Sequence, residues 1–249
     1  MNLQLITIIL KEITEVLERK NYWGGLIVYS VFFSCIGVYL FYSIINQSPI
    51  QDSNVMKNFG LEIFLIILPA FAMWLFNEQF VKEKFADEKL FRKFETILTT
   101  PVKLTTVWAG KIVAIFLLSY PLAILTILTF SLIWMILGDS SSILIPSTAS
   151  WVMIIFVAPI TPILYAAFTG WAILRFVSWQ RIMELLFFIA IAAFICIFFI
   201  SRSFLTPTNT EPLTNWRIVL FSIVISIALF GLIFYLMSNL DKEKVISHH

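Results

Sequence analysis

Few side chains in this sequence have the types and spacing that catalysis or metal binding needs. The only histidines, His248 and His249, stand at the end of the chain, so a histidine-based metal site cannot form within its apolar runs. Three serines in such runs, Ser119, Ser222 and Ser226, have no histidine or lysine base at the same depth. The sequence therefore argues against an intramembrane enzyme and predicts no catalytic, cofactor-binding or metal-binding residues in this chain.

Three carboxylates come nearest to the interior of long apolar runs, and they are Glu62, Glu78 and Glu184. A secondary transporter or channel would normally place ionisable groups near the bilayer midplane, at a cost of about 2.5–3.5 kcal/mol each. Glu62 and Glu78 lie about 160° apart around a helix, so they cannot share one site within one chain. A transporter or channel without an ATPase partner stays an alternative. We expect Glu78, with Asn77, to lie in the bundle interior or a dimer seam, with Lys111 as the candidate partner of Glu78. The alternative is a longer helix that places Glu78 among the headgroups with Lys82.

The sequence lacks the phosphate-binding loop with the pattern GxxxxGK[ST]. Its only Gly-Lys pair is Gly110-Lys111, and Thr105 stands where the first glycine of that loop would be. In such a loop, backbone N–H groups and a lysine hold the phosphates of a nucleotide. We therefore expect that this chain binds no nucleotide in that way.

The amino-acid composition distinguishes a membrane protein from a soluble one. Of its 249 residues, 60% are hydrophobic and 13% are charged, and the mean hydropathy is +0.93. A soluble domain carries about twice that share of charge. The two cysteines, Cys35 and Cys196, both lie in apolar runs, and a disulfide between them is improbable. These values indicate an integral membrane protein and exclude a water-soluble globule and a disordered chain.

Six apolar runs are long enough, or nearly so, to cross the hydrocarbon as helices. They cover residues 24–45, 61–81, 109–137, 151–174, 184–201 and 217–238, and Pro146 with Ser147 forms a turn before the fourth run. The runs do not alternate polar and apolar residues, which excludes a β-barrel. The predicted fold is all-α: one polytopic transmembrane domain over residues 1–249.

Lysine and arginine residues set the orientation of the helices. With the N-terminus inside, fourteen of the 17 basic residues fall on the cytoplasmic side, and only Lys57, Arg202 and Arg217 fall outside. This asymmetry predicts that both termini are cytoplasmic.

Residues 2–20 precede the first run and have the pattern of an amphipathic interfacial helix. Apolar residues recur there at helical spacing: Ile6, Ile9, Leu10, Ile13, Val16 and Leu17. We place Glu12, Glu15, Glu18 and Arg19 elsewhere around this helix. It either only anchors the chain to the inner leaflet or also contacts a cytoplasmic partner.

Residues 77–108 are the richest polar segment of the chain. Glu88 and Arg92 have the spacing of an i,i+4 ion pair. Bulky apolar residues form a helical stripe on another face: Leu90, Phe91, Phe94, Ile97 and Leu98. Such a stripe on a short cytoplasmic helix must be covered by the membrane surface or by another protein.

The stretch FETILTTPVKLTTVWAGKI resembles the signature of permease subunits in ABC transporters of the type-2 export family. In that signature a cytoplasmic helix after the second span ends in a glutamate, aliphatic residues and Thr/Ser-x-Pro, and a Gly-Lys opens the third span. The matching residues are Glu95, Ile97, Leu98, Thr99, Pro101, Gly110 and Lys111. In its size and small outer loops the chain is similar to permeases of gliding-motility and nitrous-oxide-reductase maturation systems.

This resemblance implies a permease subunit of an ATP-driven exporter in the cytoplasmic membrane of a prokaryote. A separate ATPase subunit would bind ATP and magnesium, and a second permease would complete a homodimer or a pair of paralogues. The stripe of Phe94, Ile97 and Leu98 would seat in a groove of the ATPase. Glu88 and Glu95 would meet basic residues at its rim.

The resemblance also implies a translocation path between two permeases, lined by the second and fifth spans. The candidate path residues in these spans are Phe64, Pro69, Phe71, Phe187, Phe194 and Phe198. If they line the path, the cargo is lipid-like or amphipathic, because an ion or a sugar would need a more polar lining. The alternative is that these phenylalanines face lipid.

Overall fold

The computed structural model describes residues 3–47, 54–91, 102–137, 146–176, 184 and 216–240. These residues form helices and no strand, so the all-α prediction is confirmed for them. Five helical stretches are long and apolar enough to cross a membrane: Lys20–Ser43, Gly60–Leu90, Leu104–Leu137, Thr148–Arg175 and Trp216–Ser238. The chain is therefore a multi-pass membrane protein. The predicted run 184–201 lies outside the described residues, apart from Glu184.

The long helices contain the predicted runs. They are α2 (Lys20–Gln47), α3 (Asn54–Val81), α6 (Leu104–Leu137) and α10 (Trp216–Ser238). The fourth run is built from α7 (Thr148–Val152), the π-helical turn η2 (Met153–Val157) and α8 (Ile160–Arg175). Ser147 caps α7, where its side chain accepts a hydrogen bond from the backbone N–H of Ser150. Pro146 and Ser147, where the sequence predicts a turn, thus come directly before the first residue of α7.

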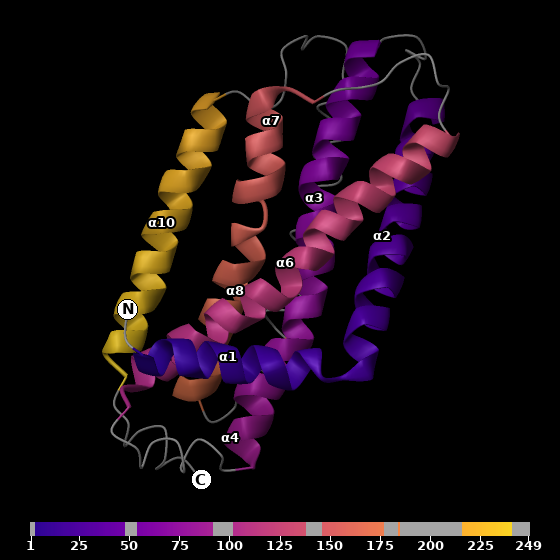
Figure 1. Ribbon diagram of the computed structural model, residues 1–249. Helices are drawn as coiled ribbons and strands as arrows, with labels where there is room; N and C mark the ends of the chain where they lie inside the picture. The colour runs from indigo at the N-terminus through magenta and orange to yellow at the C-terminus, as the bar shows by residue number, and fades with distance from the viewer. Residues whose placement is uncertain are drawn as a thin grey trace.

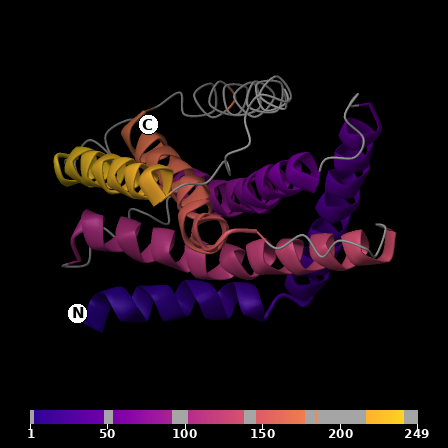
Figure 2. The ribbon, with the colours of Figure 1, turned by 90° about the horizontal axis from the view of Figure 1, so that it is seen from above.

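The N-terminal helix α1 (Leu3–Leu17) runs crosswise at one end of the long helices (Figure 1). It packs along α6, and the two helices lie side by side in the perpendicular view (Figure 2). Helical hydrogen bonding extends to Glu18, whose N–H donates to Thr14, and α2 begins at Lys20. A helix therefore occupies Leu3–Leu17 within the predicted range 2–20, and its place on the inner leaflet stays a prediction.

The central element of the bundle is α3, which contacts α2, α6 and α8 (Figure 1). In the most apolar part of the α3 span 72% of the residues are buried inside the protein, against 17% for α10. Pro69 lies inside α3. At its end, α3 continues into the π-helical turn η1 (Lys82–Asp87) and then α4 (Glu88–Leu90).

Candidate functional site

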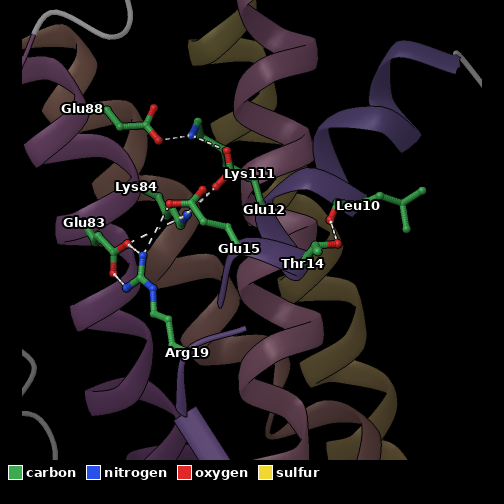
Figure 3. Close-up of polar contacts among 9 residues, drawn as sticks. All are labelled: Leu10, Glu12, Thr14, Glu15, Arg19, Glu83, Lys84, Glu88 and Lys111. Atoms are coloured by element: carbon green, nitrogen blue, oxygen red, sulfur yellow. Dashed lines mark hydrogen bonds and ion pairs between the residues drawn. The ribbon is translucent and has the colours of Figure 1, made fainter. Parts of the chain in front are cut away.

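Seven charged side chains from three distant parts of the chain meet at the α1 end of the bundle (Figure 3). They come from α1 and the turn after it, from the end of α3 with η1 and α4, and from the start of α6. We call these residues the ionic cluster: Glu12, Glu15, Arg19, Glu83, Lys84, Glu88 and Lys111.

Glu12 lies at the centre of the ionic cluster because each of its carboxylate oxygens binds a different lysine. Lys111 Nζ is 2.9 Å from Glu12 Oε1, and Lys84 Nζ is 2.8 Å from Glu12 Oε2. The three side chains are only 1–4% exposed. Lys111 also binds Glu88 Oε1 at 2.8 Å, and Lys84 binds Glu15 Oε2 at 3.0 Å. Through Glu12, the cluster therefore joins α1 by buried ion pairs both to α6 and to η1, the turn that continues α3.

The edge of the cluster is formed by Arg19 and Glu83. The Arg19 guanidinium donates to both oxygens of the Glu83 carboxylate, with 2.7 Å between Nη1 and Oε2. Their side chains are 45% and 32% exposed, and an exposed ion pair contributes little stability. This pair therefore orients the turn between α1 and α2 more than it stabilises the fold.

The lysines of the cluster keep the Glu12 and Glu15 carboxylates ionised. Burial by itself raises the pKa of Glu12, but Lys111 and Lys84 outweigh burial and hold that pKa below its ordinary value of 4.5. The pKa of Glu15 is also lowered, because its hydrogen bond and attraction to Lys84 outweigh a smaller degree of burial. Glu12 and Glu15 therefore stay charged at neutral pH, and the attraction of Glu12 to its two lysines is strong because water is largely excluded there.

Gly110 explains how α1 comes close enough to α6 to form these ion pairs. A Cβ atom at position 110 would lie 2.8 Å from Cγ2 of Ile8, closer than real Cβ atoms approach a neighbour. Ile8 and Glu12 are four residues apart and share one face of α1. Gly110 thus makes room for Ile8, and Lys111 beside it binds Glu12, so the Gly-Lys pair acts as one contact surface for α1.

The predicted arrangement of charges on α1 is wrong in one respect. Glu12 lies on the packed face of α1 with Val16, whereas Leu10 of the predicted apolar stripe is 58% exposed. The spacing of residues within α1 could not reveal this, because the lysines that compensate the Glu12 charge lie in other helices. The sequence feature that could have indicated a buried Glu12 is the position of Lys84 and Lys111 at the ends of two apolar runs.

The predicted partner of Glu78 is also wrong. Lys111 binds Glu12 and Glu88, and Glu78 forms no ion pair with any residue that the structure describes. The reason is geometric: Lys111 lies beneath α1, whereas Glu78 lies near Tyr165 of α8. Asn77 is fully buried, as expected for the bundle interior, and Glu78 is half-buried.

Lys89 is a functional candidate that sequence reasoning missed. Its Nζ donates to the backbone oxygens of Ile173, at 2.6 Å, and Phe176, at 3.1 Å. These carbonyls lie at the C-terminal end of α8, where a cation is favoured by the helix dipole. Gly170 supports the same junction, because a Cβ there would crowd the ring of buried Phe85 at 3.1–3.3 Å. The α4 segment is thus joined to α8 as well as to α6.

At the opposite end of α3, Glu62 forms a smaller polar contact. Glu62 Oε1 accepts hydrogen bonds from Ser150 Oγ at 2.7 Å and from the backbone N–H of Ser147 at 3.3 Å. The carboxylate is buried and lies at the start of α7. We call this the Glu62 contact.

Four of the five predicted ATPase-coupling residues lie outside the described part of the chain: Phe94, Glu95, Ile97 and Leu98. Arg92, the predicted ion-pair partner of Glu88, also lies outside it. Glu88 is described, and its side chain is 12% exposed and bound to Lys111. The role of these residues therefore stays a prediction. No group of three or more metal-ligating side chains occurs within the described segments.

Phe64 and Phe71, two of the predicted path residues of α3, line one apolar cavity against α2, and their role in a path stays a prediction. Phe64 is half-buried and packs on Phe41 of α2, with ring centroids 5.5 Å apart. Phe71 packs on Phe33 and Trp74 and lines a cavity between α3, α8 and α10. Pro69 is buried within α3. Phe187, Phe194 and Phe198 lie outside the residues that the structure describes.

Comparisons with protein-family models, with curated proteins and with solved structures give no match to this chain, so its function must be argued from the residues themselves.

Proposed function

We propose that this chain is the permease subunit of an ATP-driven ABC exporter in a prokaryotic cytoplasmic membrane. Two such permeases, identical or paralogous, work with separate ATPase subunits that bind ATP and magnesium. The proposal is supported by the apolar helices, by the crosswise α1 and by the family-like sequence between α3 and α6. In this proposal the α1 end of the bundle is cytoplasmic.

The strongest support for the proposal is the ion pair between Glu88 and Lys111. The ionic cluster joins the two sides of segment 92–101, which contains the family-like glutamate, aliphatic residues and proline. Glu88 lies just before this segment and Lys111 lies shortly after it, and their side chains are 2.8 Å apart. A partner that moves segment 92–101 would therefore act on α3, α6 and α1 together.

This geometry gives the cluster a positioning role in the proposed transport cycle. Closure of the ATPase subunits displaces segment 92–101, and the buried ion pairs pass this displacement to α3 and α6. The far end of α3, about 33 Å away along the helix, is held by the Glu62 contact. We expect that end to separate from α7 when the path opens to the outside.

Co-purification tests the docking part of the proposal. A tagged chain expressed with the ATPase encoded beside it should retain that ATPase. Replacing Phe94 and Leu98 with Asp should release the ATPase while the chain remains inserted, because a charge cannot occupy an apolar groove. Leu3→Asp, at an exposed apolar residue of α1, is the matched control. Transport by the purified chain alone would favour the secondary-transporter alternative.

A further inference from the structure

A cavity of about 560 Å³ lies between α3, η2, α8 and α10. Its volume falls in the range of 300–1,000 Å³ that is usual for small-molecule sites. The walls are mostly apolar, with Phe71 and Trp74 from α3 facing Leu229 and Phe221 from α10. These helices belong to spans, so the cavity lies at membrane depth and suits a hydrocarbon chain.

Two of the four hydroxyl groups that line the cavity are hydrogen-bonded within their own helices. Ser226 Oγ donates to the backbone oxygen of Ser222 at 2.7 Å, and Thr161 Oγ1 donates to that of Ala158 at 2.9 Å. They therefore offer little to a polar ligand group. Tyr165, whose ring lies 5.5 Å from that of Trp74, marks the more polar end of the cavity.

Glu78 lies one helical turn beyond Trp74 on the face of α3 that lines the cavity, and close to Tyr165 of α8. Its carboxylate has neither a hydrogen bond nor an ion pair with the described residues. Lys82, four residues further along the chain, is exposed and makes no ion pair with it. An ionisable group at a span end, beside an apolar cavity and without a partner, is a candidate ligand contact.

We propose that this cavity binds a single-chain amphiphile with a cationic ammonium head. The alkyl chain lies along the wall formed by α3, α8 and α10, and the ammonium group donates hydrogen bonds to the Glu78 carboxylate. An anionic head would be repelled by Glu78, and a neutral head would not balance its charge. Binding at this site does not depend on the proposed function. Only the role of the amphiphile as the exporter's cargo rests on it.

Binding can be measured with the full chain in neutral detergent, without any ATPase. The probe is octadecylamine with two bromine atoms on its alkyl chain, which quenches nearby tryptophan fluorescence. Saturable quenching that disappears in Trp74→Phe would place the alkyl chain in the cavity. Octadecanoic acid with the same bromines is the matched anionic probe. No ATPase is present in this measurement. A failure to bind the amine would therefore count against the cavity site and would leave the result of the co-purification experiment unaffected.

Loss of a charge-assisted hydrogen bond predicts that Glu78→Gln weakens amine binding about tenfold or more. Glu78→Asp should retain most of the binding, and Glu18→Gln, at an exposed carboxylate just after α1, should retain all of it. Ser226→Phe should fill the cavity and abolish binding, whereas Ile227→Phe on the exposed face of α10 should not. Gel filtration identifies any variant that fails to fold.

The proposal is overturned if both probes bind equally well, or if Glu78→Gln leaves amine binding unchanged. Quenching that persists in Ser226→Phe or in Trp74→Phe would also overturn it, because the probe would then lie on the general lipid-facing surface.

Discussion

The two ends of α3 are held in different ways. Just beyond one end, Lys84 and Glu88 take part in a network of ion pairs with α1 and α6. Towards the other end, Glu62 accepts hydrogen bonds from the start of α7. The first contact involves charges of both signs from three parts of the chain. The second joins the Glu62 carboxylate to the hydroxyl group of Ser150 and the backbone N–H of Ser147. The two ends of the same helix are thus held by interactions of different strength.

This difference indicates how α3 can move. Removing one partner of a buried ion pair leaves an uncompensated charge, so the α1 end resists separation from α1 and α6. A hydrogen bond from a hydroxyl group to a carboxylate can be replaced by water at the end of a span. We therefore expect the α1 end to move as one body and the Glu62 end to open.

The largest effect is expected for Lys111→Met, which leaves the buried Glu12 and Glu88 carboxylates without their shared cation. The free energy of unfolding should fall by about 3–5 kcal/mol. Lys103→Met is the matched control, since Lys103 is exposed just before α6. Thermal unfolding in detergent measures both, and equal stability of the two variants would show that the ionic cluster does not hold this end together.

Gly110→Val should have the next largest effect. The added side chain must displace Ile8 and so push α1 away from α6, at a cost of about 1–3 kcal/mol. Gly231→Val introduces the same side chain in α10, where nothing lies within 4 Å of the new Cβ atom. Both substitutions change helix propensity alike, so the difference between their unfolding temperatures isolates the contact with α1.

Glu62→Ala tests the weaker end of the comparison. It removes two hydrogen bonds to a charged acceptor, and the free energy of unfolding should fall by about 1–3 kcal/mol, less than for Lys111→Met. Glu184→Ala, at an exposed carboxylate, should cause no loss. If Glu62→Ala destabilises the chain more than Lys111→Met does, the proposed order of the two ends is reversed.

Arg19→Ala should have the smallest effect, about 0.2–1 kcal/mol, because the Arg19–Glu83 pair is partly exposed. Unlike the buried pairs, this contribution should shrink further at high salt. Denaturation of the variant and the unaltered chain at low and high ionic strength checks this. A loss as large as that of Lys111→Met would mean that the edge of the cluster, and not its buried centre, secures α1.

The parts of the molecule that sequence could predict follow from local rules. The described spans were predictable because a helix needs about 20 apolar residues to cross the hydrocarbon. The turn at Ser147 was predictable because serine is a preferred N-cap. The ionic cluster was not, because Glu12 and Lys111 are far apart in the chain and their pairing depends on how α1 packs on α6. The contact of Lys89 with backbone oxygens of α8 has no counterpart in residue spacing.

The different roles of the two ends can be tested most directly by locking each end in turn. In a chain with Cys35 and Cys196 replaced by Ser, one variant carries Glu62→Cys with Ser150→Cys, and another carries Arg19→Cys with Glu83→Cys. The two cysteines of each variant are joined with a short bis-maleimide, because side chains that meet only at their ends are too far apart for a disulfide. ATP turnover by the permease–ATPase complex is measured before and after this cross-linking, so that each variant without the cross-link is its own control. Cross-linking should stop turnover when it joins positions 62 and 150 and should leave turnover unchanged when it joins positions 19 and 83. The opposite pattern would contradict the proposal that the α1 end moves as one body while the Glu62 end opens.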